Sequence, residues 1–467
     1  FLKRYGPEMR VQAGAFYTPQ PAVHHMVAMV DTVLRERLGL ERGLADPATW
    51  GDVSSRLGFD LPPVIDPDSR FVSILDPATG TGTFLVEAIK RARASFVAAG
   101  GSTSAWPEFA RTQIVPNLYG LELMLAPYAV AHLKTALELN LEGVPDGHLN
   151  IFLTDPLARG TGQQLTAMSG ALSIEGERAN AVKENLRATV CIGNPPYDRV
   201  ARDAGGGWIT AEYQGRSPFD DILDVAREHT IFSHHASLYN KFVYFWRWAL
   251  WKVFEDRPGL PGVISLITPS SWLTGPGFVG LRQLVRRLGD EVWVTDLAGD
   301  NRGTRRDENI FAIETPVAIV TVYRGEGSPE VPAKVHYRRI EGTAEAKLHT
   351  LERSPVVLDG GEWQVAPEGW LDPLVPPTGA ASWGQHPLLA DLFPWQQPGA
   401  MFSRTWPISR SSEILALRWT RFVTETDLNE RARMYVTPKS GRTIFTRVGR
   451  RPRLADETET SPVPPVV

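Results

Sequence analysis

A tetrapeptide of unusual chemistry, Asn194-Pro195-Pro196-Tyr197, directly follows the short apolar run VCIG. Proline has no backbone N–H and fixes its own φ, and it disfavours a helical conformation in the residue before it. The pattern therefore predicts a stiff, extended turn at the end of a strand. This turn would present an amide, two carbonyls and an aromatic ring, which together can bind and stack on a flat amino group. A plain two-proline strand cap is the competing interpretation.

A glycine-rich turn follows another apolar run, FVSIL, and leads into a helical pattern: Asp76-Pro77-Ala78-Thr79-Gly80-Thr81-Gly82-Thr83-Phe84. Glycine lets the backbone turn tightly and approach a ligand, and the N-terminus of a helix favours a carboxylate or a phosphate. Nucleotide binding and a purely structural turn are both compatible with this pattern. The turn departs from the G-x-G-x-x-G pattern of dinucleotide-binding proteins, which disfavours a dehydrogenase.

Acidic residues end the next two apolar runs, Glu122 in LYGLE and Asp155 in NIFLTD. In open α/β sheets, ligands bind at the carboxyl ends of the strands. We therefore expect Glu122 to accept hydrogen bonds from ribose hydroxyls and Asp155 to bind an exocyclic adenine amine.

The elements that must position these residues are short apolar strands alternating with helical patterns. This alternation predicts an α/β fold with a doubly wound, mostly parallel sheet covered on both faces, preceded by an N-terminal helical cap. We expect a helical segment over residues 1–70, a catalytic domain over 71–330, a C-terminal region over 331–454 and a disordered tail over 455–467. The aromatic run 239–254 is expected to be a buried helix face.

The composition sets outer limits on the function. The chain has 467 residues, a net charge of −4 and a single cysteine, Cys191, which excludes internal disulfides and fits a reducing cytoplasm. No apolar run reaches membrane-spanning length. The sequence contains no P-loop motif, so it gives no sign of a motor domain. The chain opens without methionine, which is consistent with a fragment of a longer protein.

In this order, the motifs resemble those of adenine-N6 DNA methyltransferases of the gamma arrangement. AFYTPQPAV resembles their first motif, DPATGTGTFL their cofactor loop, NPPY their catalytic motif and NIFAIETPVAIV a later motif that packs against the extruded base. The segments YNKF and PGAMFSRTW resemble the methyltransferase region of single-polypeptide, Type I-like (Type ISP) restriction–modification enzymes. The resemblance covers about residues 5–450, and its C-terminal part would be a partial DNA-recognition region.

This resemblance implies a site-specific methyltransferase of a restriction–modification or phage-defence system, acting on double-stranded DNA without a metal. S-adenosylmethionine would be the cofactor, and the nuclease and helicase regions of that family would lie outside this chain. The implied catalytic residues are Asn194, Pro195, Pro196 and Tyr197. The base would contact Tyr197, Phe311 and Asn240. The cofactor would contact Phe16, Thr18, Asp76, Ala78, Gly80, Gly82, Thr83, Phe84, Glu122 and Asp155.

The implied chemistry needs no strong base. The side-chain oxygen of Asn194 and the carbonyl of Pro195 would each accept one N6 hydrogen, which turns the nitrogen lone pair toward the methyl donor. Tyr197 and Phe311 would sandwich the extruded base and offset the cost of unstacking it.

Two basic segments are candidates for DNA contact. The run DNRGTRRDENIF carries Arg302, Arg305 and Arg306, and residues 401–453 contain Arg404 among twelve Lys/Arg against four Asp/Glu, with aromatic residues between them. The alternative for the first segment is a plain polar loop, and the alternative for residues 401–453 is a solvated face.

Two rival functions stay open. One is an NPPY methyltransferase that acts on a protein glutamine or on RNA, and the other is a catalytically silent DNA-binding subunit. The F-x-T-P motif and the long region after residue 330 favour DNA, and the intact NPPY motif argues against a silent subunit.

Overall fold

A computed structural model of the chain describes residues 18–139, 149–158, 171–198, 207–210, 217–230, 232–256, 259–299, 307–311, 313–325, 330–377, 409, 411–427 and 430. The chain divides into two compact units, Phe1–Thr378 and Gly379–Val467. The first unit contains the sheet. In the second, the described residues form the helix α17 (Ser412–Thr424).

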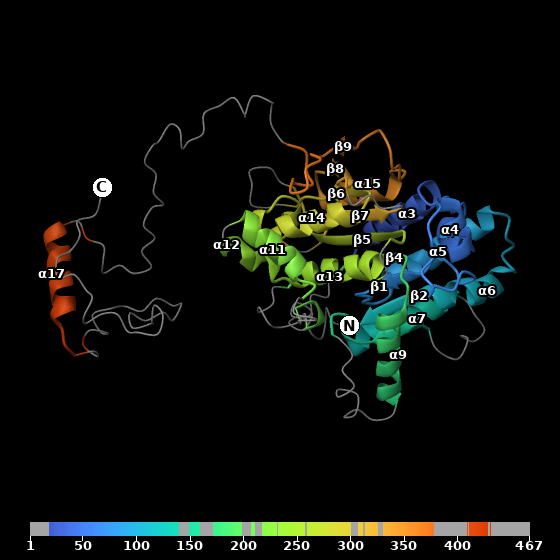
Figure 1. Cartoon of the computed structure of the whole chain (residues 1–467), viewed down its shortest axis with the longest axis horizontal. Coiled ribbons are helices and arrows are strands. Elements are labelled where there is room, and N and C mark those ends of the chain that lie inside the picture. The colour runs from blue at the N-terminus through green and yellow to red at the C-terminus, as the bar shows by residue number, and fades with distance from the viewer. Residues whose placement is uncertain are drawn as a thin grey trace. The chain divides into compact units, whose positions relative to one another are not determined.

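A nine-stranded sheet, in the order β3-β2-β1-β4-β5-β7-β6-β8-β9, organises the first unit (Figure 1). The strands from β3 to β5 are parallel, whereas β7 is antiparallel to both β5 and β6. The predicted α/β fold with a mostly parallel sheet is therefore confirmed. The strands are β1 Ile74–Asp76, β2 Leu118–Glu122, β3 Ile151–Leu153, β4 Val190–Gly193, β5 Gly262–Pro269, β6 Glu291–Asp296, β7 Val317–Arg324, β8 Lys334–Arg339 and β9 Gln364–Val365.

The α-helices of this unit connect the strands or flank them. They are α3 Gln20–Glu36, α4 Trp50–Leu57, α5 Thr83–Ala98, α6 Trp106–Phe109, α7 Leu125–Leu139, α9 Ala171–Asn185, α10 Gly207–Thr210, α11 Asp220–His229, α12 Phe232–His235, α13 Lys241–Leu250, α14 Val279–Leu288 and α15 Ala344–Arg353. Short helical turns are η1 Gly43–Ala45, η2 Ala110–Ile114, η3 Val115–Asn117, η5 Ala236–Leu238, η6 Trp251–Glu255, η7 Ser270–Leu273 and η8 Pro276–Phe278.

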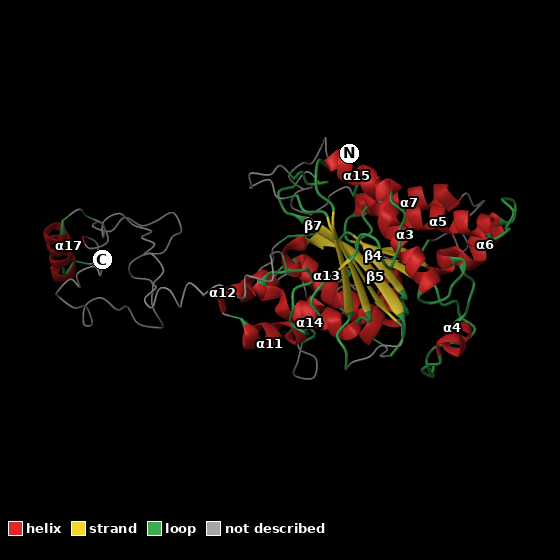
Figure 2. Ribbon diagram, turned by 90° about the horizontal axis from the view of Figure 1, so that it is seen from above, coloured by secondary structure: helices red, strands yellow, loops and turns green. Residues whose placement is uncertain are grey.

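Helices cover both faces of the sheet. Figure 2 shows α3, α5, α7 and α15 on one face and α11, α13 and α14 on the other. Successive strand residues point to opposite faces, so Ile74 belongs to the core beneath α3 and α5, whereas Leu75 belongs to the core beneath α13 and α14. This double burial explains why the strands are almost continuously apolar.

Local sequence signals set several helix ends. Pro19 precedes α3 and Pro21 lies in its first turn, where a missing N–H costs no helical hydrogen bond. The side chains of Asn240 and Thr343 cap the N-termini of α13 and α15. The aromatic run is a buried helix face, as expected, and Cys191 is a buried core residue.

The sheet continues beyond residue 330 into β8 and β9, and α15 packs against α3. The domain limits expected at residues 70, 330 and 454 stay predictions. In the described part of the chain, no helix combines the length and the apolar character that a membrane crossing requires.

Candidate active site

The predicted polar residues gather at one edge of the sheet because their strands run parallel. Asp76 is the last residue of β1 and Glu122 is the last residue of β2. Asn194 directly follows β4, and Asp155 lies two residues after β3. The carboxyl ends of parallel strands meet at the same edge, so the structure brings together these four residues from four neighbouring strands.

The glycine-rich turn between β1 and α5 is tightly folded. Gly80 and Gly82 have φ values of +55° and +78°, in the left-handed region that disfavours other residues. A Cβ atom on Gly82 would lie 3.1 Å from the Cα of Ala131 in α7. Gly82 thus allows α5 to start close against α7.

Glu122 joins this loop to β2. Its Oε2 accepts a hydrogen bond from the N–H of Gly80 at 2.8 Å, and its Oε1 accepts one from Met124 at 2.7 Å. Burial raises the pKa of Glu122 although these N–H groups oppose the shift. Each carboxylate oxygen has a second lone pair, so the group can still accept hydrogen bonds from a ligand.

Asp76 is a fully buried carboxyl group beside the glycine-rich turn. Its Oδ1 accepts a hydrogen bond from Ala78 at 3.0 Å, whereas its Oδ2 has no hydrogen-bond partner among the described residues. Burial raises the pKa of Asp76 to about 8, with the charge of Glu122 adding to the effect. A buried acceptor without a partner is costly, which marks this atom as a candidate ligand contact.

Asp76 also lies against the strand that leads to the Asn-Pro-Pro-Tyr turn. A Cβ atom on Gly193 would approach the Oδ1 of Asp76 to 2.7 Å. Only glycine therefore fits immediately before Asn194 without moving the carboxyl group. The start of the glycine-rich turn therefore adjoins the residue before the Asn-Pro-Pro-Tyr turn.

The side chain of Asn194 is held at both ends. Its Nδ2 donates to the Oγ1 of Thr18 at 3.0 Å, and its Oδ1 accepts from the hydroxyl of Tyr197 at 2.6 Å. The same hydroxyl lies 3.2 Å from the carbonyl of Ile267 in β5. Burial raises the pKa of Tyr197 well above its usual range. The motif before α3 and the turn after β4 therefore meet at the amide.

Glu87 of α5 keeps the N-terminal end of α3 beside this amide. Its two carboxylate oxygens accept hydrogen bonds from Gln20 at 2.7 Å and contact His24 at 2.8 Å. Neither partner belonged to the predicted site, because a glutamine and a histidine near a helix start carry no distinctive sequence signal. These bonds fix the position from which Thr18 reaches Asn194.

Asp155 lies in a turn that Lys183 anchors. The Oδ1 of Asp155 accepts from Leu157 at 2.9 Å, and its carbonyl accepts from the Nζ of Lys183 at 2.6 Å. Burial lowers the pKa of Lys183 to about 8, against the opposing effect of Asp155. A lone lysine in α9 gives no sequence signal, so this anchor was not predicted.

Besides Tyr197, the two residues expected to contact the base, Asn240 and Phe311, lie on separate segments. Asn240 accepts a hydrogen bond from Phe242 at 3.2 Å, and the next residue, Lys241, donates its N–H to the carbonyl of Asp198 at 3.0 Å. The N-terminus of α13 therefore adjoins the end of the Asn-Pro-Pro-Tyr turn. Phe311 is buried in the same core as α3 and α5.

The other predicted residues differ in exposure. Ala78, Thr83 and Pro196 are half-buried, whereas Phe84 and Pro195 are buried, Phe84 within the hydrophobic core. Five predicted contacts lie outside the described residues: Phe16, Arg302, Arg305, Arg306 and Arg404.

One group of potential metal ligands occurs away from this edge in the described part of the chain. Single ligand atoms of Glu291, His336 and Asp359 all lie within 4.8 Å of one another. The guanidinium of Arg37 binds Glu291 at 2.5 Å and Asp359 at 2.9 Å. The cation of Arg37 thus already pairs with both carboxylates, so the group is an ion-pair network.

Comparison with known protein families finds no match, and no curated protein sequence matches the chain either. Solved structures do match. A cryo-electron-microscopy structure of a DrdV–DNA complex covers 80% of this chain at 24% identity with a TM-score of 0.57. The Type ISP restriction–modification enzyme LlaBIII bound to DNA covers 91% at 20% identity with a TM-score of 0.58.

A nuclease-deletion mutant of the Type ISP restriction–modification enzyme LlaGI, in complex with a DNA substrate mimic, covers 90% of this chain at 21% identity with a TM-score of 0.58. The matches span 32%, 28% and 38% of these three longer chains. The likeness therefore shows that this chain shares its fold with one part of DrdV and of these two restriction–modification enzymes.

Proposed function

We propose that this chain transfers a methyl group from S-adenosylmethionine to the N6 atom of adenine at specific sites in double-stranded DNA. The observation that supports this most strongly is the placement of the Asn194 amide, which lies at the carboxyl edge of β4 between Thr18 and Tyr197. The buried carboxyl group of Asp76 adjoins the residue before that amide.

The residues at this edge fit S-adenosylmethionine. The partnerless Oδ2 of Asp76 suits a cationic amino group, and Glu122 can accept hydrogen bonds from ribose hydroxyls. Asp155, in its anchored turn, would bind the adenine amine, and the positive-φ glycines let the backbone approach the ligand. Phe16, Ala78, Thr83 and Phe84 complete the proposed contacts. When bound, this cofactor supplies an electrophilic methyl group on a sulfonium.

The chain's own part in the reaction is to hold and orient the target amine. The Oδ1 of Asn194 and the carbonyl of Pro195 would accept the two N6 hydrogens, so that the nitrogen lone pair faces the methyl group. The Tyr197 hydroxyl bonds to Oδ1 in this structure, and the second lone pair of the amide oxygen can accept from the amine beside it. The ring of Tyr197 then stacks on the base, which contributes about 1–3 kcal/mol.

Two findings support DNA as the substrate. LlaBIII and LlaGI, which share this fold, were each solved with DNA or a DNA mimic. In addition, Arg302, Arg305, Arg306 and Arg404 belong to basic segments of the sequence that suit phosphate contact. Asn240 and Phe311 would contact the extruded base beside Tyr197.

The chain would work within a restriction–modification or phage-defence system. It spans about a third of the length of the three solved structures described above. Nuclease and helicase activities, where such a system has them, would thus belong to other regions or subunits.

The test is a label-transfer assay. The chain is incubated with tritiated S-adenosylmethionine and, in parallel, with duplex DNA of complex sequence, RNA and a protein extract. We expect label in DNA, and sequencing for modified bases should then identify the site. Label that appears only in RNA or protein would refute DNA methylation, and an Asn194→Ala variant that labels DNA as well as the wild type would refute the catalytic assignment.

A further inference from the structure

Lys347, on α15, lies in the part of the chain after β8 and has no role in the site described above. Its side chain is completely buried. Its Nζ donates to the carbonyls of Leu297 at 2.6 Å and Glu308 at 2.8 Å, and it pairs with the Oδ1 of Asp307 at 2.7 Å. Each of the three ammonium protons therefore has an oxygen acceptor, as a buried lysine requires.

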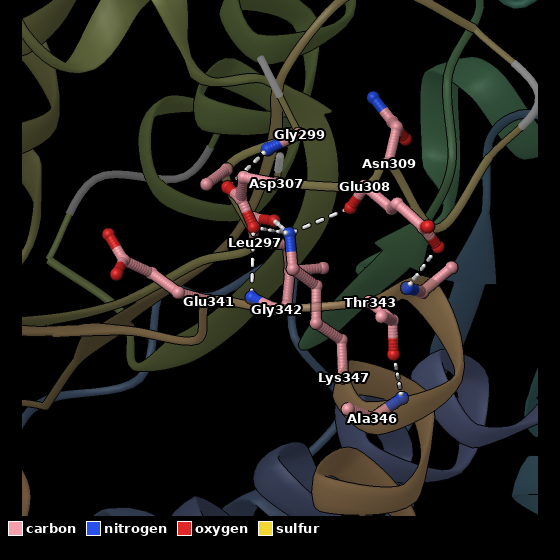
Figure 3. Close-up of polar contacts among 12 residues, drawn as sticks. Leu297, Gly299, Asp307, Glu308, Asn309, Glu341, Gly342, Thr343, Ala346 and Lys347 are labelled. Atoms are coloured by element: carbon pink, nitrogen blue, oxygen red, sulfur yellow. Dashed lines mark hydrogen bonds and ion pairs between the residues drawn. The ribbon is translucent and has the colours of Figure 1, made fainter. Parts of the chain in front are cut away.

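Asp307 extends this network to two more chain segments. Its Oδ2 accepts from the N–H of Gly299 and its Oδ1 accepts from the N–H of Gly342, both at 3.0 Å. Figure 3 shows both bonds ending on the Asp307 carboxylate, which also contacts the ammonium group of Lys347. Burial alone would raise the pKa of Asp307, but Lys347 and the two N–H groups hold it below its usual range.

The backbone around this network is in conformations that need support. Ala298 has a φ of +49° and is the one non-glycine residue with positive φ in the described part of the chain, and Gly299 follows at +99°. Such a conformation is strained in alanine and persists only where the surroundings enforce it. Ala298 itself donates to the Oδ1 of Asp296 and accepts from the N–H of Val317, and the bonds to Leu297 and Gly299 hold the residues on either side of it.

The network holds the start of the segment that leads to Phe311. From Asp307 the chain continues to Asn309, whose Nδ2 donates to the carbonyl of Thr315 at 2.6 Å and whose Oδ1 accepts from the N–H of Phe311 at 2.8 Å. The segment then docks on the end of β5, where Pro316 accepts a hydrogen bond from Ser270. Tyr197 also bonds to β5, at Ile267. The segment of Phe311 and the side chain of Tyr197, the two aromatic residues of the proposed base pocket, are therefore both held by contacts at β5.

The helix that carries Lys347, α15, also contacts the helix that follows Thr18. α15 packs against α3, and α3 follows Thr18, which holds the Asn194 amide. Through Lys347 and through this packing, α15 contacts both the Phe311 segment and the helix that places Thr18. An ion pair whose lysine is fully buried is weak support for stability alone, because desolvation of the ammonium group opposes its formation. A role in holding a specific geometry accounts for it better.

We propose that Lys347 is a positioning residue for target-base recognition: its ammonium group, bound to Asp307, Leu297 and Glu308, holds Phe311 in place for the base beside Tyr197. The inference rests on the proposed function. Lys347 contacts neither cofactor nor base, so its loss should reduce the steps that involve the extruded base and leave cofactor binding unchanged.

The test uses Lys347→Met in the whole chain, with a duplex that carries 2-aminopurine at the adenine found by sequencing. We expect the fluorescence rise on base extrusion to fall to less than half, kcat to fall at least about tenfold and the Kd for S-adenosylmethionine to stay within twofold. An unchanged 2-aminopurine signal with wild-type kcat would overturn the proposal, as would a parallel loss of cofactor binding.

Two further variants separate positioning from loss of stability. Lys252→Met removes another fully buried ammonium, which binds the carbonyl of Lys183 and pairs with Asp256. It should lower stability comparably and leave the 2-aminopurine signal intact. Gly299→Ala keeps all charges, but its Cβ would lie 2.9 Å from the Cα of Asn309. It should therefore reproduce the Lys347→Met defect, and it replaces that variant if Lys347→Met does not fold.

Amide hydrogen exchange measured without DNA tests the role of Lys347 separately from DNA methylation. Lys347→Met should accelerate amide exchange in residues 307–311 and leave β4 protected. If that occurs but the wild-type chain methylates no DNA, the proposed function fails while the contact between Lys347 and the Phe311 segment stands. If the wild type methylates DNA and exchange in 307–311 is unchanged, the positioning role fails by itself.

Discussion

At the scale of single residues, the proposed chemistry depends on how an amide is oriented. An asparagine side chain can donate at one end and accept at the other, so its neighbours decide what it offers to a substrate. Thr18 and Tyr197 contact the two ends of Asn194. Thr18 binds the donor end of the amide and therefore keeps the acceptor end, Oδ1, directed toward the base.

Replacing Thr18 by valine tests this contact. Valine keeps the shape and removes the hydroxyl, so kcat should fall about tenfold, which corresponds to about 1.4 kcal/mol of transition-state stabilisation. Thr18→Ser should retain most of the activity. Steady-state kinetics and cofactor titration measure both effects. If Thr18→Val instead weakens S-adenosylmethionine binding and leaves kcat unchanged, Thr18 serves the cofactor and does not orient the amide.

Asp76 should make cofactor binding depend on pH. Its pKa is raised to about 8 by burial, so the free protein holds this carboxyl group protonated at neutral pH. A bound cationic amine favours the carboxylate, so binding releases a proton. The affinity for S-adenosylmethionine should therefore rise by up to about tenfold per pH unit below about pH 7.5. Calorimetric titration at several pH values measures this slope.

The stability of the ligand-free protein should change in the opposite direction. The carboxyl group of Asp76 has a pKa of about 3.9 in the unfolded chain, so between about pH 4 and 8 the folded state binds more protons and stability falls as pH rises. Asp76→Asn should remove both the binding slope and this contribution to stability. A wild-type affinity that does not vary with pH would contradict the proposed contact.

At the scale of elements, the turn between β1 and α5 requires glycine for two reasons at Gly82, its positive φ and the closeness of α7. Gly58, which ends α4, has a similar φ of +75°, but a Cβ atom added there would meet no other atom within 4 Å. Gly58→Ala should therefore cost about 1 kcal/mol from backbone strain alone. Gly82→Ala should cost more and should also weaken S-adenosylmethionine binding. Thermal unfolding and cofactor titration compare the pair, and equal losses with unchanged binding would show that the approach to α7 is unimportant.

The strands were predictable because burial on both faces makes each one a short apolar run, and an acid or an amide marks its end. Glu122 at the end of β2 is one such case. The contact between Thr18 and Asn194, separated by 176 residues, was not predictable, since it depends on how α3 packs on the sheet. Lys347 was equally hidden, because a lysine in an amphipathic helix usually faces water.

At the scale of the whole molecule, the chain divides near Thr378. The sheet and every described candidate cofactor contact precede this point, whereas the basic segment 401–453 follows it. A chain that ends at Thr378 should therefore bind S-adenosylmethionine with a Kd within about twofold of the full chain. Its affinity for DNA should fall and should vary less with salt concentration, because fewer phosphate contacts release fewer counterions. Unchanged DNA binding and salt dependence would indicate that the segment is only a solvated face.

In the proposed reaction, the Asn194 amide at the end of β4 binds the N6 amine of adenine. Mass spectrometry of nucleosides from DNA incubated with S-adenosylmethionine and the chain measures this most directly. We predict N6-methyldeoxyadenosine with the wild type, and a loss of at least about a hundredfold in Asn194→Ala at unchanged cofactor binding. Methylation at another atom, or N6-methyldeoxyadenosine formed equally well by Asn194→Ala, would contradict the claim.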